Sequence, residues 1–113
     1  MHEMSICESV VATAEQVARR ENAARVTRVR LEIGCFGGVE LDALRFSFDV
    51  VANGTLADGA ALEIIELPGR AWCFPCGTAH EMRVRGDPCP TCGGHQLQVV
   101  GGEELRIKDL EVV

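Results

Sequence analysis

Four of the six cysteines occur as two short pairs, and this spacing constrains the fold more than any other feature of the 113-residue sequence. Cys73-Phe-Pro-Cys76-Gly and Cys89-Pro-Thr-Cys92-Gly are two copies of C-x-x-C-G with twelve residues between them. Two thiolates three positions apart on a tight turn can both face one ion, and the glycine permits the backbone conformation that turns amides toward the sulfurs. Two such turns complete a tetrahedron and leave no open position. The spacing therefore predicts a structural zinc site held by Cys73, Cys76, Cys89 and Cys92.

Other uses of the cysteines are open at this point. Iron competes most directly, because rubredoxin-type sites hold one iron with the same kind of pairs. A redox pair needs only one C-x-x-C, and disulfides would be labile in a reducing compartment, so both fit less well. Cys7 is expected to pack as a small apolar side chain, whereas the role of Cys35 is open. His80 and His95 lie near the pairs and are expected to be solvated loop residues.

The spacing of apolar residues before the cysteine pairs predicts two helices. From Ser5 to Asn22 apolar residues recur every three or four positions, which indicates an amphipathic helix with one buried stripe. Helical spacing returns at Leu41 and stops at Asn53-Gly54.

Three strands are expected from other patterns. Residues 27–33 alternate between apolar and charged side chains, which is typical of a strand with one face on the core. Residues 61–67 are rich in Leu, Ile and Glu and end at Pro68-Gly69. A third strand begins at Leu105, and its alternation slips before Leu110, as a one-residue bulge would cause. The predicted fold class is therefore α+β, a small three-stranded sheet with two helices.

The segment with the cysteine pairs differs from the rest of the chain. Residues 71–95 hold all four paired cysteines, three of the four prolines and little periodic apolar sequence. A piece of this size cannot bury enough surface to fold alone, whereas structural zinc contributes an apparent ~10 to 16 kcal/mol in zinc-finger peptides. We expect an inserted zinc-ribbon-like domain at residues 71–95, within an α/β domain formed by residues 1–70 and 96–113.

Charge and composition argue against nucleic acid and membranes as partners. The formal net charge is -6 and the pI is near 5.0, so no basic field attracts phosphates, and aromatic residues make up only 4%. No apolar run approaches the roughly 18 residues of a membrane span, and the start Met1-His2-Glu3 lacks the basic region of a signal peptide, so we expect a cytoplasmic protein. No nucleophile and base pairing, P-loop or H-E-x-x-H motif is visible, and we expect no enzyme.

Several segments together carry a family resemblance. The chain opens Met-His-Glu-Met-Ser, contains LDALRFSFDVVANGT at residues 41–55 and the two cysteine pairs, and ends with GEELRIKDLEV at residues 102–112. In this combination it resembles the HypA/HybF family of hydrogenase nickel-incorporation proteins over essentially its whole length.

The resemblance implies a nickel carrier without covalent catalysis, in which residues 1–70 and 96–113 form the nickel-binding α/β domain. It implies His2 as the nickel ligand with Glu3 as its functional neighbour, zinc on the four paired cysteines, and delivery of Ni(II) to the [NiFe]-hydrogenase large subunit together with the GTPase HypB. Ni(II) accepts square-planar nitrogen donors, and a chelate can use the Met1 amine, the amide and imidazole of His2 and the Glu3 amide. A homodimer is left open. A zinc-ribbon interaction module and a rubredoxin-like iron electron carrier are the alternative functions.

Overall fold

The computed structural model describes residues 2–113, and the chain divides into two compact units. The first unit contains the residues up to Leu31, together with Val39–Ile65 and Arg106–Val113. The second unit contains Glu32–Gly38 and Glu66–Leu105. The assignment of residues 71–95 as an inserted domain stays a prediction.

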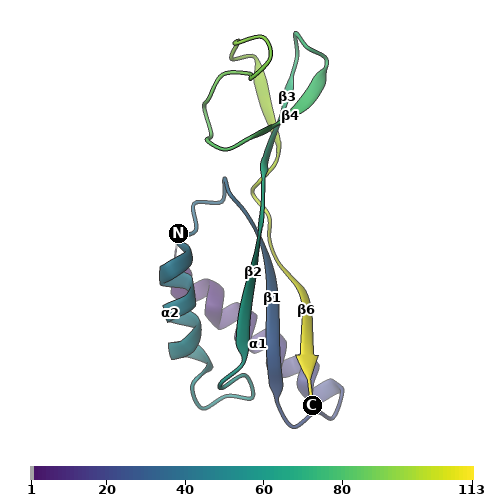
Figure 1. The fold of residues 1–113 in the computed structure, drawn as a ribbon. Helices are drawn as coiled ribbons and strands as arrows, with labels where there is room; N and C mark the ends of the chain where they lie inside the picture. The colour runs from purple at the N-terminus through teal and green to yellow at the C-terminus, as the bar shows by residue number, and fades with distance from the viewer. Residues whose placement is uncertain (1) are drawn as a thin grey trace. The chain divides into compact units, whose positions relative to one another are not determined.

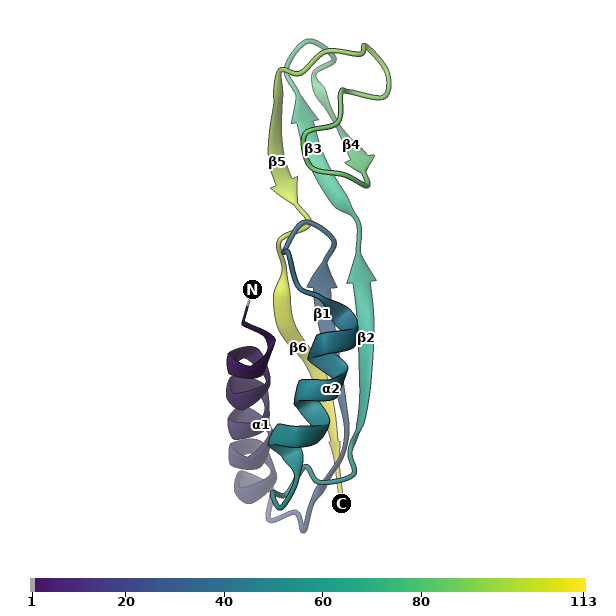
Figure 2. The same cartoon turned by 90° about the vertical axis from the view of Figure 1, so that its left-hand side faces the viewer.

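Two helices and a three-stranded sheet, with strand order β2-β1-β6, build the first unit. The elements are α1 (Glu3–Arg20), β1 (Val26–Gly34), α2 (Leu41–Ala52), β2 (Ala61–Leu67) and β6 (Leu105–Val112). Figures 1 and 2 show both helices on one face of this sheet, and Figure 2 shows β1 and β2 pointing the same way with α2 in the connection between them. The predicted arrangement of two helices with a three-stranded sheet is confirmed. Among the described helices, none is long and apolar enough to cross a membrane.

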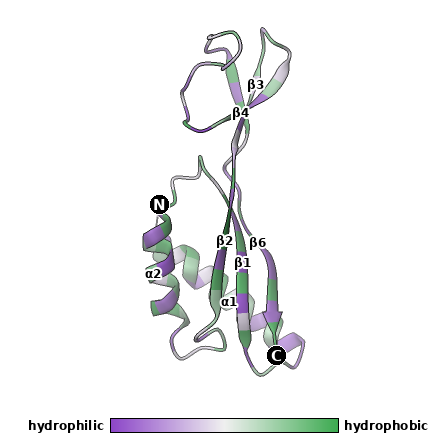
Figure 3. Ribbon diagram, in the orientation of Figure 1, coloured by the Kyte–Doolittle hydropathy of each residue, from purple (hydrophilic) through white to green (hydrophobic). Residues whose placement is uncertain are grey.

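The core of the first unit lies between the helices and the sheet. Hydrophobic and hydrophilic residues alternate along α2 in Figure 3, and Leu44, Phe48 and Ala52 are the apolar ones that are buried, whereas Phe46 and Val50 are exposed. The apolar stripes of α1 and α2 pack against each other and against β1. The fully or nearly fully buried side chains are Cys7, Val10, Val11, Ala14 and Ala18 of α1, Leu44, Phe48 and Ala52 of α2, and Val26, Val29 and Leu31 of β1.

Ion pairs lie on the face of β1 opposite to the face that carries its buried side chains. Arg28 donates to Glu63 of β2 at 3.0 Å and to Glu111 of β6. Arg30 donates from Nε to Oδ1 of Asp109 on β6 at 2.7 Å. The alternation of apolar and charged residues in this strand therefore has the predicted consequence of one core face and one polar face.

Helix α1 is displaced by two residues from the predicted Ser5–Asn22. It ends at Arg20 because the chain reverses there: Asn22 has φ 55, the left-handed conformation in which helices commonly stop. The N–H of Ala23 donates to the carbonyl of Ala18 at 2.8 Å and that of Asn22 to Arg19 at 3.1 Å, which is the pattern of a Schellman motif.

The second unit contains a separate antiparallel sheet. Its strands, β3 (Gly69–Cys73), β4 (Thr78–Met82) and β5 (Leu97–Gly101), are arranged in the order β4-β3-β5. Sequence analysis did not predict these strands, because they are short and the inner face of β3 consists of Gly69, Ala71 and Cys73 rather than of large apolar side chains. The expectation that His80 lies in a solvated loop is wrong, since it is half-buried within β4.

Candidate metal centre

The two cysteine pairs fold into turns of the same kind. Cys73 ends β3, and the turn that carries Cys76 leads directly into β4. The N–H of Gly77 donates to the carbonyl of Cys73 at 2.9 Å, and Gly77 has φ 66, a conformation that disfavours residues with a side chain. A glycine after each pair is thus required by the backbone of the turn.

The second pair repeats this geometry in the loop between β4 and β5. The N–H of Gly93 donates to the carbonyl of Cys89 at 2.9 Å, and Gly93 has φ 73. The N–H of Cys89 in turn donates to the carbonyl of Gly94 at 2.8 Å. Gly94, for which the sequence predicted no role, therefore helps to close the loop that holds Cys89 and Cys92.

The four sulfur atoms converge on one point. The Sγ atoms of Cys73 and Cys92 lie 3.6 Å apart, those of Cys76 and Cys89 lie 3.9 Å apart, and all four lie within 4.8 Å of one another. Zinc–sulfur bonds of about 2.3 Å require tetrahedral sulfur–sulfur edges of about 3.8 Å. The donor set fits a tetrahedral metal ion, and the two printed sulfur–sulfur distances are close to the edge length that zinc requires.

The environment of the sulfurs favours a bound cation. The backbone N–H of Cys92 is the main influence on Cys89 and lowers the pKa of that thiol, while burial opposes it. Hydrogen bonding to the sulfur of Cys73 and burial raise the pKa of the Cys76 thiol. Without a cation the cluster thus retains protons, because four adjacent thiolates would repel one another. A divalent metal removes this penalty and deprotonates the set.

The remaining cysteines and the nearby histidines lie outside this cluster. All six cysteines are free thiols. The prediction for Cys7 is confirmed: it is 1% exposed, its thiol donates to the carbonyl of Leu44 at 3.4 Å, and burial raises its pKa to about 11. Cys35 is exposed. Among the described residues, Nε2 of His80 is buried without a hydrogen-bond partner, and His95 is exposed.

The predicted nickel residues lie at the start of α1, in the first unit. His2 is exposed and occupies the N-cap position of the helix, and Glu3 is its first residue. The N–H of Glu40 donates to the Glu3 carboxylate at 3.3 Å and lowers the pKa of that group. Glu40 also caps α2 by accepting from the N–H of Ala43 at 2.9 Å. This link between the two helix starts had no signal in the sequence. Met1 lies outside the described residues.

Fold and site together define a class. The chain has a small α+β fold with a four-cysteine cluster of zinc-ribbon type that fits a metal ion. Its sequence matches, over residues 1–112, the family described as "Hydrogenase/urease nickel incorporation, metallochaperone, hypA". It is 59% identical over 112 residues to hydrogenase maturation factor HypA of Alkalilimnicola ehrlichii, covering 99% of each chain, and 58% identical over 113 residues to that of Rhodobacter capsulatus, covering both completely. The chain belongs to the HypA family, whose members are nickel-incorporation metallochaperones for hydrogenase maturation.

Solved structures confirm the fold class. The structure titled "Solution structure of the Ni metallochaperone HypA from Helicobacter pylori" superposes with a TM-score of 0.70 at 23% sequence identity, covering 100% of this chain and 98% of that one. Another, titled "Solution structure of HypA protein", gives a TM-score of 0.73 at 23% identity, covering 100% of this chain and 97% of that one. At 23% sequence identity, the similarity to these two structures shows the fold alone.

Proposed function

We propose that this protein binds Ni(II) through His2, with Met1 and Glu3, and delivers it to the large subunit of a [NiFe]-hydrogenase. The observation that carries the proposal is the exposed position of His2 at the N-cap of α1, in a chain of a nickel-incorporation family. An ion held there is reachable by a partner protein. The transfer passes metal from one set of ligands to another and involves no covalent catalysis by the chaperone.

The start of a helix suits such a chelate. The first N–H groups of an α-helix have no carbonyl partner within the helix, so deprotonating the amides of His2 and Glu3 breaks no helical hydrogen bond. Ni(II) with two deprotonated amides carries no net charge, and the positive end of the helix dipole therefore does not repel the complex. The carboxylate of Glu3, bound to the N–H of Glu40, holds the first turn of α1 against α2.

The four-cysteine cluster has a different role in this proposal. Cys73, Cys76, Cys89 and Cys92 hold a structural Zn²⁺, which supplies a fixed crosslink between the two turns. Four thiolates occupy every position of a tetrahedral zinc ion, so the site has no place for a substrate or for water. Persistent free thiols also require a reducing compartment, which supports cytoplasmic action.

The partners follow from the family. We infer that the chain cooperates with the GTPase HypB and that the large subunit receives the nickel. No P-loop is visible in this sequence, so HypB would supply the nucleotide-driven control of the transfer. The net charge of -6 favours partners with basic surfaces.

Nickel titration of untagged, zinc-loaded protein tests the proposal. His2→Ala is expected to abolish nickel binding while the circular dichroism spectrum and the zinc content stay unchanged. Extension of the N-terminus by a four-residue Gly-Ser-Gly-Ser tag is expected to do the same, because it keeps the imidazole but moves the terminal amine away from the chelate. Glu8→Ala, at an exposed position of α1, is the matched control and retains nickel. Full nickel binding by both the substituted and the extended protein would reject the site.

A further inference from the structure

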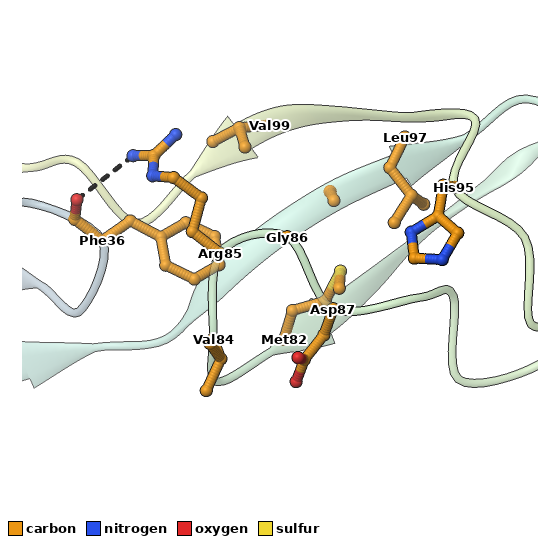
Figure 4. Close-up of a pocket in the computed structure, with 10 residues that line it drawn as sticks. Phe36, Met82, Val84, Arg85, Gly86, Asp87, His95, Leu97 and Val99 are labelled. Atoms are coloured by element: carbon orange, nitrogen blue, oxygen red, sulfur yellow. Dashed lines mark hydrogen bonds between the residues drawn. The ribbon is translucent and has the colours of Figure 1, made fainter.

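The second unit contains a small pocket that the metal centre does not use. It lies between the inner face of the sheet and the loop after β4, and has a volume of about 140 Å³. Six of its lining residues are apolar, namely Phe36, Ala71, Met82, Val84, Leu97 and Val99, and Arg85, Asp87 and His95 line it as well. Figure 4 shows Phe36, Met82, Val84, Leu97 and Val99 around the cavity, with Arg85 and His95 at opposite ends and Asp87 on the loop.

Small residues in the sheet leave this space empty. Ala71 occupies a buried, inner-face position of β3 directly beside the metal-ligand position Cys73, and it is 2% exposed. A larger apolar residue there would fill the gap between sheet and loop.

The wall of the pocket is held in place before any ligand binds. Arg85 donates to the carbonyl of Phe36 at 3.1 Å and to the carboxylate of Glu103 at 3.0 Å. Its guanidinium also lies 5.1 Å from the centre of the Phe36 ring, within the range of a cation–π contact. Because these contacts fix the loop, binding does not have to order it, and such preorganisation favours affinity.

The size of the pocket selects one side chain. A cavity of about 150 Å³ lined by apolar residues binds benzene, so this one accommodates a single leucine, isoleucine or phenylalanine side chain. The neighbouring charges select what flanks that side chain. Of the two charged side chains that line the pocket, Arg85 is already paired with Glu103, whereas Asp87 has no ion-pair partner among the described residues. The second unit as a whole carries six carboxylates against three guanidinium groups, a formal charge of -3.

We propose that this pocket binds a basic segment of a partner protein, with one large apolar side chain inserted between Ala71, Leu97 and Val99 and a neighbouring lysine or arginine facing Asp87. This recognition is independent of the nickel site. It gives the second unit a function in partner binding besides that of holding a metal.

Nuclear magnetic resonance titration of the full, zinc-loaded chain tests this with three peptides. Acetyl-Gly-Lys-Leu-Lys-Gly-amide is expected to shift the methyl signals of Met82, Leu97 and Val99. The same peptide with alanine for leucine is expected to bind about tenfold more weakly or worse, because burying a leucine contributes about 1.5 to 3 kcal/mol. The peptide with glutamate for both lysines is expected to bind more weakly as well. Equal binding of the three peptides, or shifts that map outside the pocket, would overturn the proposal.

Two variants and a matched control sharpen the result. Ala71→Leu fills the cavity and is expected to abolish peptide binding while the zinc content is retained. If that variant does not fold, Val84→Lys at the mouth of the pocket replaces it and is expected to weaken binding by charge repulsion. Val100→Lys is the control, since Val84 and Val100 are both 57% exposed but Val100 lies outside the pocket.

Methyl shifts that grow with protein concentration without peptide would assign the pocket to a second copy of this chain and overturn the proposal. The His2→Ala protein is expected to bind peptide normally, so failure here and failure of the nickel proposal are distinguishable.

Discussion

Gly69 is a position where the absence of a side chain decides the local packing. A Cβ atom placed on Gly69 would lie 2.1 Å from Cζ of Phe36, far inside any permitted contact. Gly102 is restricted twice, since a Cβ there would lie 2.7 Å from the Cα of Gly69 and its φ is 107. The Phe36 ring thus rests on two glycines, and the same ring forms the end of the pocket.

Gly69→Ala is therefore expected to destabilise the second unit by about 1 to 3 kcal/mol, the usual cost of forcing extra atoms into a packed site. Denaturation of the zinc-loaded protein, followed by the fluorescence of Trp72, measures this, since Trp72 is the single tryptophan and the chain has no tyrosine. In the double variant with Phe36→Ala the two losses should not add, because the ring that causes the clash is gone. Additive losses would contradict the steric explanation.

Asp109 provides a pH-dependent contribution to the first unit. The hydrogen bond from Arg30 is the main cause that holds the pKa of Asp109 below its ordinary value of 3.8. Its ionised form therefore stabilises the fold above that ordinary value, and the contribution is lost as the pH falls through the lowered pKa of the folded state. Asp109→Asn is expected to reduce stability at neutral pH and to flatten the loss of stability in acid. Urea denaturation at several pH values measures both effects, and Asp49→Asn on the exposed side of α2 is the control. An unchanged acid slope in Asp109→Asn would contradict the assignment.

At the scale of the element, two phenylalanines of α2 separate the buried face from the exposed one. Phe48 is 1% exposed and packs in the core, whereas Phe46 is 69% exposed. Phe48→Ala is expected to cost about 3 to 5 kcal/mol, the range for removing a buried aromatic ring. Phe46→Ala is expected to change stability by less than about 0.5 kcal/mol. Thermal denaturation followed by helical circular dichroism compares them, and similar losses in both variants would show that the face is assigned wrongly.

The elements that sequence analysis predicted are those whose core face is made of large apolar residues at a regular period. Val29 and Leu31 alternate with arginines, and Leu44 and Phe48 are one helical turn apart, so the pattern alone identifies β1 and α2. The strands of the second unit lack that signal. In β3, Ala71 and Cys73 are buried and Arg70 and Trp72 are exposed. Because the buried residues are small, the alternation of hydrophobicity along the sequence is weak.

The metal centre could be predicted in more detail than the strands that hold it. Four ligands at fixed spacing determine a tetrahedron without knowledge of the surrounding fold, and the sulfur positions agree with it. By contrast, the bond between the Glu3 carboxylate and the N–H of Glu40 depends on how α1 packs against α2, and the pocket depends on a loop closing over Ala71. Neither is encoded in a local pattern.

At the scale of the whole molecule, the two units are stabilised by different means. The first unit has helices packed on a sheet around large buried side chains such as Phe48, Leu44 and Leu31. In the second unit the buried residues are mostly small, and two of the four paired cysteines, Cys73 and Cys89, are among them. We therefore expect the fold of the second unit to depend on a metal ion bound by the four cysteines.

Metal removal is therefore expected to unfold the second unit while the first stays folded. Treatment with EDTA should change the fluorescence of Trp72, which neighbours Cys73, and should open the loop after β4 to proteolysis, while the helical circular dichroism is retained. Cys73→Ser should reproduce this state without a chelator, because one lost thiolate leaves the tetrahedron incomplete. EDTA already saturated with zinc is the control for effects of the chelator itself. Loss of helical signal together with the Trp72 change would show instead that the two units unfold as one, and the metal would then stabilise the whole chain rather than its second unit.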